Sequence, residues 1–223
     1  MPQGSILGPV LLLCHINEIS TNIQSTIRLY ADDCVLYRPI ISDQDNNALQ
    51  SDLYTLCKWS DCWKLNFNVS KCKVMNMSRK RNPQQHSYYI DNNKLSTTGC
   101  EKYLGVTITD KLNWDGHCQD TYVKCNRMLG LIKRNFGKCS IDVLKKLYIS
   151  LIRTRLDYCC IAWDPYRIFH SSVVERVQKQ SVRFICRDWH TSYDTLTNDL
   201  GLTDLQTRRK ILRLTMCYKI LKV

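Results

Sequence analysis

The spacing of apolar residues divides the chain into two portions of different character. Up to about residue 110, short runs rich in β-branched and aromatic residues alternate with turn-forming residues, which is typical of strands and hairpins. From Asn113 onward, apolar residues recur every three or four positions, as on amphipathic helices. The pattern predicts an α+β fold class. Residues 1–110 are expected to hold a largely antiparallel sheet with covering helices, and residues 111–223 to be all-helical.

Helices are expected in both portions. An apolar stretch over residues 10–19 follows a glycine-containing loop, and we expect it to form a buried helix. Ser42 and Asp43 can cap a second helix that runs to about Trp63 with its apolar residues on one face. The helices expected in the second portion are roughly Trp114–Phe136, Ile141–Ala162, Ser171–Arg187 and Asp204–Leu221.

Three short segments are expected to form strands after the capped helix. Lys73–Met77 alternates like a strand, and Tyr88–Leu95 indicates a hairpin around an Asn-Asn turn. Tyr103–Ile108 then closes the β-containing portion. These strands would supply the sheet that the helix covers.

A pair of adjacent carboxylates lies in the middle of another extended segment, Thr26–Tyr37. Asp32 and Asp33 are turn-formers between two arms that favour extended backbone, so the segment predicts a hairpin with two acids at its tip. Such a pair is most often a solvent-facing turn. The alternative is that carboxylates held on rigid strands bind a hard cation such as Mg²⁺. The surrounding motifs have to decide between the two.

The chain is strongly basic. Lysine and arginine number 32 against 20 acids, which gives a net charge of +12 and a pI near 9.1. This excess favours binding of a polyanionic partner, most of all the phosphates of a nucleic acid. The alternative is a basic surface that binds no such partner. The basic residues expected on the helical faces are Lys124, Arg127, Lys133, Arg134, Lys145, Lys146, Arg153, Arg155, Lys179, Arg183, Arg208, Arg209 and Lys210.

The thirteen cysteines do not indicate a secreted disulfide framework. Their number is odd and no secretory segment is convincing, so we expect reduced thiols, most of them small buried side chains. The cysteines and the five histidines do not complete a zinc-finger spacing. No apolar run is long enough to span a bilayer. We therefore expect no membrane partner and an intracellular location, in the nucleus or the cytoplasm; the oligomeric state stays open.

Four motifs occur in a characteristic order. They are Pro2-Gln3-Gly4 with Leu7-Gly8-Pro9, Tyr30-Ala31-Asp32-Asp33, Asn68 with Lys71-Cys72-Lys73, and Tyr103-Leu104-Gly105-Val106. In this order and spacing they resemble the reverse transcriptases of non-LTR retrotransposons, with the jockey-like group closest. Later blocks such as Arg155-Leu156-Asp157-Tyr158 resemble the helical region that follows the palm in these elements. The resemblance therefore extends over nearly the whole chain.

The resemblance implies an RNA-directed DNA polymerase that binds an RNA template, a DNA primer and a dNTP. Residues 1–110 would be part of the palm, and residues 111–223 the thumb with a C-terminal extension. The residues that would contact these partners are Gln3 and Gly4 beside the nucleotide and template, Tyr30 at the primer terminus, and Tyr103, Leu104 and Gly105 on the primer strand.

The resemblance also implies the catalytic residues. Asp32 would be a ligand of two Mg²⁺ ions with Asp33 beside it, and Lys71 would lie near the triphosphate. Nucleotidyl transfer needs such groups, because two cations about 3.5–4 Å apart lower the charge on the attacking and leaving oxygens. Carboxylates must bridge these cations, and a basic side chain offsets the charge that develops on pyrophosphate.

One part of the family pattern is missing from this sequence. The third carboxylate of the family's site lies on a strand that precedes the Gln3-Gly4 loop, and two acids are too few to hold two Mg²⁺ ions in fixed geometry. We therefore expect a reverse-transcriptase fragment with little or no polymerase activity by itself. Two alternatives stay open: a non-catalytic nucleic-acid-binding remnant, and a translated fossil that does not fold stably.

Overall fold

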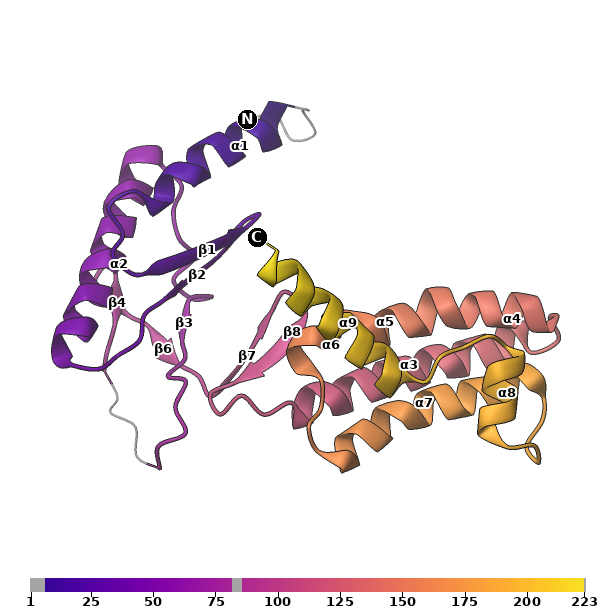
Figure 1. The fold of residues 1–223 in the computed structure, drawn as a ribbon. Coiled ribbons are helices and arrows are strands. Elements are labelled where there is room, and N and C mark those ends of the chain that lie inside the picture. The colour runs from indigo at the N-terminus through magenta and orange to yellow at the C-terminus, as the bar shows by residue number, and fades with distance from the viewer. Residues whose placement is uncertain (1–6, 82–85, 223) are drawn as a thin grey trace. The chain divides into compact units, whose positions relative to one another are not determined.

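The computed structural model describes residues 7–81 and 86–222, which form two compact units divided after Gly99 (Figure 1). Helices make up about 57% of the structure and alternate with small sheets, so the α+β class is confirmed at that level. The sequence placed its boundary near residue 110 instead. None of the described helices is long and apolar enough to cross a membrane.

The first unit holds α1 (Leu7–Asn17), the short 3₁₀ helix η1 (Glu18–Ser20) and α2 (Asp43–Trp63). The expected helix from Ser42 to Trp63 is confirmed. Its first turn is fixed because the backbone N–H groups of Ile41 and Ser42 donate to Asp45 Oδ2 at 3.1 and 3.0 Å. These bonds, with the Arg38 guanidinium, lower the pKa of Asp45 to about 2.

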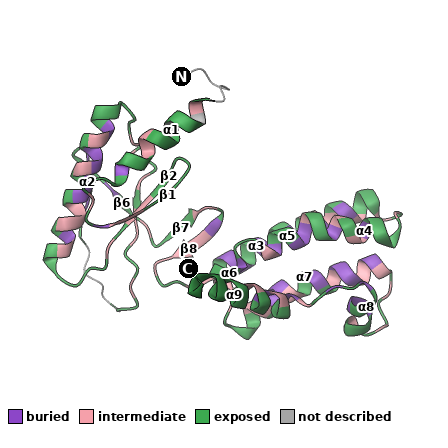
Figure 2. Ribbon diagram, turned by 45° about the horizontal axis from the view of Figure 1, so that its top comes forward, coloured by how far each residue is buried: buried purple, intermediate pink, exposed green. Residues whose placement is uncertain are grey.

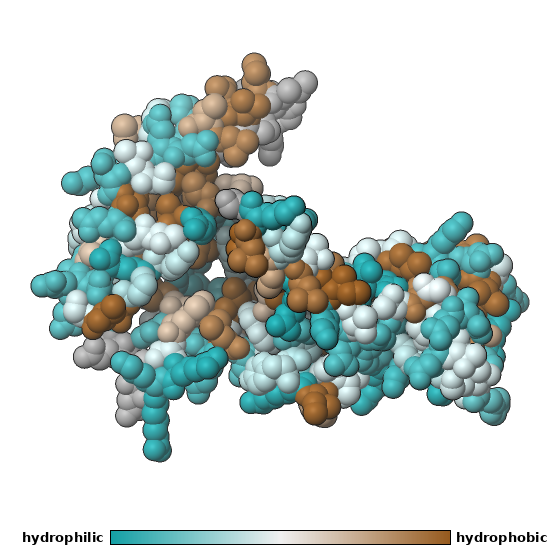
Figure 3. Space-filling view, viewed as in Figure 1, coloured by the Kyte–Doolittle hydropathy of each residue, from teal (hydrophilic) through white to brown (hydrophobic). Residues whose placement is uncertain are grey.

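The expected burial of the first helix is wrong for the described residues. Along α1, Leu7, Val10, Leu11 and Leu13 are all exposed, and the helix presents a largely brown, hydrophobic surface in Figure 3. The described neighbours of α1 are chiefly η1 and Trp63, whose ring lies 4.3 Å from that of His15. An apolar helix buries its side chains only where other elements cover it, and the described chain covers little of this one.

The described strands of the first unit form three separate pairs. β1 (Thr26–Tyr30) and β2 (Asp33–Tyr37) are antiparallel, as are β4 (Tyr89–Ile90) and β5 (Asn93–Lys94), whereas β3 (Lys73–Val74) and β6 (Ser96–Thr97) are parallel. The expectation of one largely antiparallel sheet is therefore only partly met. Their core consists of Ile19, Leu53, Leu56, Cys57, Tyr88, Ile90 and Leu95.

The second unit begins with an antiparallel hairpin, β7 (Cys100–Tyr103) and β8 (Val106–Thr109). The helices that follow are α3 (Asp115–Phe136), α4 (Ile141–Leu147), the π-helix η2 (Tyr148–Arg153), α5 (Thr154–Asp157), α6 (Cys160–Trp163), α7 (Ile168–Cys186), α8 (Tyr193–Asp199) and α9 (Leu205–Leu221). Three of the four predicted helices are confirmed to within a few residues. The predicted helix Ile141–Ala162 is interrupted at Tyr158 and Cys159, and α8 was not predicted.

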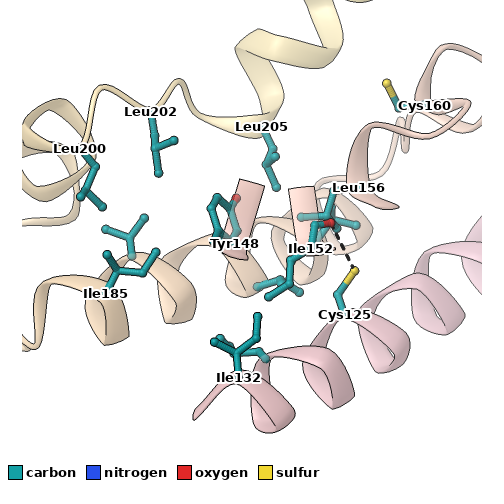
Figure 4. Close-up of a cluster of buried hydrophobic side chains, with 14 of the residues drawn as sticks. Cys125, Ile132, Tyr148, Ile152, Leu156, Cys160, Ile185, Leu200, Leu202 and Leu205 are labelled. Carbon is teal, nitrogen blue, oxygen red and sulfur yellow. Dashed lines mark hydrogen bonds between the residues drawn. The ribbon is translucent and has the colours of Figure 1, made fainter. Parts of the chain in front are cut away.

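The core of the second unit lies between the long helices. Figure 2 shows the buried residues of α3 and α7 in purple, and Figure 4 shows Tyr148, Ile152 and Leu156 pointing among side chains of other helices. Each fully buried apolar side chain contributes roughly 1.5–3 kcal/mol to stability. Inside this core the Tyr148 hydroxyl donates to Gln178 Oε1 at 2.7 Å.

The structure assigns no disulfide bond to the thirteen cysteines, all of which lie in its described part, and most of them are not buried. Only Cys57, Cys118, Cys125 and Cys160 are fully buried. Desolvation raises the pKa of Cys118, Cys125 and Cys160 to about 11, so these thiols remain protonated and unreactive at neutral pH.

Candidate catalytic hairpin and nucleic-acid surface

The two predicted catalytic acids lie at the tip of the β1–β2 hairpin. Tyr30 pairs with Asp33, so the two-residue turn is Ala31-Asp32 and Asp33 is the first residue of β2. The sequence placed the turn one residue later, at Asp32-Asp33, and that register is wrong. The observed register pairs Ile27 with Leu36 and so turns apolar side chains of both strands towards the core.

The hairpin tip faces solvent. Tyr30 is 64% exposed, and Asp32 and Asp33 are also exposed. Directly opposed residues of antiparallel strands share a face, so the side chains of Tyr30 and Asp33 project to the same side. Ala31 has φ +53°, a conformation that L residues rarely adopt, so the turn is locally strained. The carboxylates are therefore accessible to a ligand, as both the turn and the metal-site interpretations require.

A buried carboxylate anchors the hairpin to α2. Asp52, which is 2% exposed, accepts hydrogen bonds from the backbone N–H groups of Gln24 at 2.9 Å and Ser25 at 2.8 Å, just before β1. No sequence motif pointed to this residue. Its one distinguishing feature was an acid on the apolar face of a predicted helix, between Leu49 and Leu56. Asp52 therefore sets the position at which β1 begins.

The predicted catalytic lysine lies on a segment next to this hairpin. Lys71 is exposed in a turn where its backbone N–H donates to Asn68 O at 2.9 Å. Burial of the Cys34 thiol raises its pKa to about 11, and the Cys72 thiol adds to this effect. Cys34 as a whole residue is exposed. Cys72, which follows Lys71, and Leu36, on β2, pack against the same buried core cluster, so the Lys71 segment and the hairpin cover one core.

The acids of the hairpin suit Mg²⁺ only in part. Carboxylate oxygens are the ligands that Mg²⁺ prefers. In the described parts of the chain, however, no group of three histidine, cysteine, aspartate or glutamate side chains is placed to hold a metal ion. Asp32 and Asp33 thus provide two ligands of the correct type without a complete site.

The remaining predicted site residues lie elsewhere. Gln3 and Gly4 fall outside the described residues. Tyr103, Leu104 and Gly105 form the end of β7 and its two-residue turn, in which Leu104 has φ +45° and Gly105 φ +83°. Two positive φ values suit the type I′ turns that connect twisted strands closely. These three residues belong to the second unit.

The basic residues of the second unit do not all lie on its surface. Arg209 is 2% exposed and binds Asp164 at 2.8 Å and Glu175 at 3.4 Å, and Arg153 is also buried. For these two arginines the expectation of an exposed basic face is wrong, because Arg209 on α9 is bound to Asp164 and Arg153 on η2 donates to Thr203 O, in the loop before α9. Arg127 and Arg134 remain exposed on α3, where they line a shallow hollow of about 430 Å³ together with Gly130.

Comparison with known proteins places these features in a family. Residues 1–108, which include the acidic hairpin and the Lys71 turn, match the reverse transcriptase (RNA-dependent DNA polymerase) family. Slightly less than half of the chain is thus similar to this family, and the relatives described next are named as RNA-directed DNA polymerases of mobile elements. The resemblance in the four sequence motifs is thereby confirmed.

The relatives come from mobile elements of insects. The chain is 24% identical over 212 residues to the probable RNA-directed DNA polymerase from transposon X-element of Drosophila melanogaster, covering 91% of this chain and 23% of that protein. It is 26% identical over 219 residues to the RNA-directed DNA polymerase from mobile element jockey of the same species, covering 92% and 24%. The chain thus spans about a quarter of these relatives. No solved structure matches it.

Proposed function

We propose that this chain is part of the polymerase core of a non-LTR reverse transcriptase, an RNA-directed DNA polymerase. The observation that carries the proposal is the Tyr30-Ala31-Asp32-Asp33 segment on an exposed hairpin tip, inside the region that matches the family. In this proposal residues 1–110 belong to the palm, and the helices after them act as the thumb. The nucleic-acid partners are an RNA template and a DNA primer, and dNTP is the substrate.

Each residue of the first unit then has a specific task. Asp32 and Asp33 would be Mg²⁺ ligands, and the aromatic ring of Tyr30 would lie beside the primer terminus. Lys71 would offset charge on the triphosphate, which suits an exposed cation on the segment next to β2. Gln3 and Gly4 would approach the nucleotide and the template. Asp52 contributes indirectly, because it holds the start of β1.

We further propose that the 223-residue chain by itself does not sustain DNA synthesis. Nucleotidyl transfer through two metal ions needs bridging carboxylates, and the described residues bring only two acids to the tip. A third carboxylate would have to come from residues outside this sequence. The magnesium site is thus complete only when such a segment joins the hairpin.

Primer extension tests both statements. The purified chain is incubated with an RNA template, a DNA primer, dNTPs and Mg²⁺, alone and with a separately produced polymerase segment of a jockey-type relative that carries the third carboxylate. We expect no extension by the chain alone and measurable extension in the mixture. Asp32→Ala should abolish the extension in the mixture. Robust synthesis by the chain alone contradicts the proposed incompleteness, and extension that survives Asp32→Ala contradicts the assigned site.

A second function, nucleic-acid binding without catalysis, is favoured by the charge of the chain. The net charge is +12, and exposed arginines line the hollow on α3. Phosphate contacts release counterions, so affinity should fall steeply with salt. If the chain only binds nucleic acid, Asp32→Ala should leave its affinity for RNA–DNA duplexes unchanged. The mixture of the chain with the polymerase segment of a relative should then not extend a primer. Binding measured between about 50 and 200 mM salt tests this alternative.

A further inference from the structure

The β7–β8 hairpin is fastened to the helices of the second unit at two points. At its turn, the Tyr158 hydroxyl donates to Leu104 O at 2.8 Å. On β8, the backbone N–H of Thr107 donates to Nδ1 of His117, on α3, at 3.2 Å. Figure 1 shows the hairpin beside the helices that carry these two side chains. The hairpin and these helices are therefore joined by side-chain hydrogen bonds as well as by the chain itself.

Tyr158 reaches the turn because the helix breaks there. α5 ends at Asp157, Tyr158 has ψ 119°, and Cys159 has φ +52° before α6 begins. The carbonyl of Tyr158 is held by Trp163, a fully buried residue whose Nε1–H donates to it at 2.8 Å. The backbone of Tyr158 is thus fixed from the core side, while its side chain extends to the hairpin.

The turn is shaped to accept this ring. A Cβ on Gly105 would lie 3.3 Å from Tyr158 Cε1, and Gly105 also has φ +83°, so a side chain at this position is disfavoured twice. Tyr158 is nevertheless 56% exposed. Its ring is therefore no part of the buried core, and its hydroxyl forms a specific contact at the molecular surface.

We propose that Tyr158 is a positioning residue, which fixes the Tyr103–Val106 turn so that hairpin and helices present one rigid surface to a template–primer duplex. This inference rests on the proposed function and adds to it the primer contact of Tyr103, Leu104 and Gly105 that the family resemblance implies. Tyr158 acts through the turn, because its hydroxyl is engaged by Leu104 O. The break between α5 and α6, which the helical periodicity did not predict, gives the residue this reach.

Tyr158→Phe isolates the hydrogen bond, because it keeps the ring against Gly105 and removes only the hydroxyl. Amide hydrogen exchange at Gly105 and Val106 reports the mobility of the turn. The affinity of the chain is measured for two RNA–DNA hybrids of equal length, one with a recessed primer 3′ end and one with a blunt end. We expect faster exchange and a loss of affinity of about 2- to 12-fold, the worth of one net hydrogen bond. The loss should be confined to the recessed hybrid, with the melting temperature lowered by only about 2–4 °C.

Tyr166→Phe is the matched control, since Tyr166 is 69% exposed and lies on the same unit. It should change neither exchange nor affinity. The inference is overturned if Tyr158→Phe leaves turn exchange unchanged, or if it lowers the melting temperature by more than about 4 °C and weakens both hybrids equally. If the wild-type chain binds neither hybrid, the proposed function fails, and the positioning role fails with it. Faster amide exchange of the turn in Tyr158→Phe would still show that the hydroxyl anchors the turn.

A double-mutant cycle adds a second measurement. Gly105→Ala should speed exchange strongly in the wild-type chain, where the methyl group meets the Tyr158 ring. In a Tyr158→Ala background it should have a smaller effect, because only the backbone cost of positive φ remains. Strictly additive effects on turn exchange would contradict the proposed contact.

Discussion

Asp52 offers the sharpest test of how this chain positions its acidic hairpin. The carboxylate lies on α2 and accepts two backbone N–H groups from the segment that leads into β1. Asp52→Ala removes both acceptors at once. The backbone N–H of Ser25 then stays buried without a partner, whereas the exposed Gln24 can bind water instead.

The expected cost follows from these two environments. Losing a hydrogen bond to a charged acceptor costs about 1.5–3 kcal/mol, and a buried unsatisfied donor costs about 1–3 kcal/mol. Because the Gln24 bond is partly replaced by water, we expect Asp52→Ala to lower the free energy of unfolding by about 2–4 kcal/mol. That is a large fraction of the 5–15 kcal/mol that is typical of a folded domain.

The assay needs a probe confined to the first unit. Amide hydrogen exchange over residues 24–37, followed at increasing urea concentration, reports the stability of the hairpin and its anchor. Asp52→Asn should give an intermediate loss in the free energy of unfolding, since its amide oxygen can still accept a hydrogen bond. Asp61→Ala, an exposed change on the same helix, should stay within about 0.5 kcal/mol of wild type. If Asp52→Ala also stays within that range, the anchoring role is refuted.

Three further predictions concern other parts of the molecule. Tyr148→Phe should destabilise the second unit by about 1–3 kcal/mol, because Gln178 Oε1 loses its buried donor; chemical denaturation measures this. Replacing Arg127 and Arg134 together by alanine should weaken binding to an RNA–DNA duplex and lower the salt slope by about 2. The pKa of Asp45 is about 2 in the folded chain against an ordinary value of 3.8, so its stabilising effect is present above pH 4 and is lost as pH falls towards 2.

Each of these predictions has its own control. Tyr54→Phe, the control for Tyr148→Phe at an exposed tyrosine, should leave the free energy of unfolding unchanged. A double alanine substitution at Arg79 and Lys80 removes the same charge from the first unit and should reduce duplex binding less than the change on α3. Asp45→Asn should reduce the acid dependence between pH 4 and 2, of which Asp188 in the second unit, with its pKa also lowered to about 2, retains a part. A titration of unfolding that is identical in this variant and in wild type would contradict the assignment.

The local elements of this chain were predictable from its residues alone. α2, α3 and α9 begin and end within a residue or so of their predicted limits, because apolar periodicity and capping residues are local properties. The acidic hairpin and its family resemblance were likewise readable from short motifs. In contrast, α8 was missed, although Ser192 caps it by accepting the N–H of Thr195 at 3.2 Å.

The tertiary structure decided whatever depends on partners distant in sequence. The hairpin turn moved by one residue because the register is set by which side chains reach the core. Arg209 became a buried ion-pair residue because Asp164 and Glu175 lie beside it in space, some 45 and 34 positions away in the chain. Asp52 and Tyr158 gained their roles in the same way, through side-chain hydrogen bonds to backbone groups that no local pattern places near them.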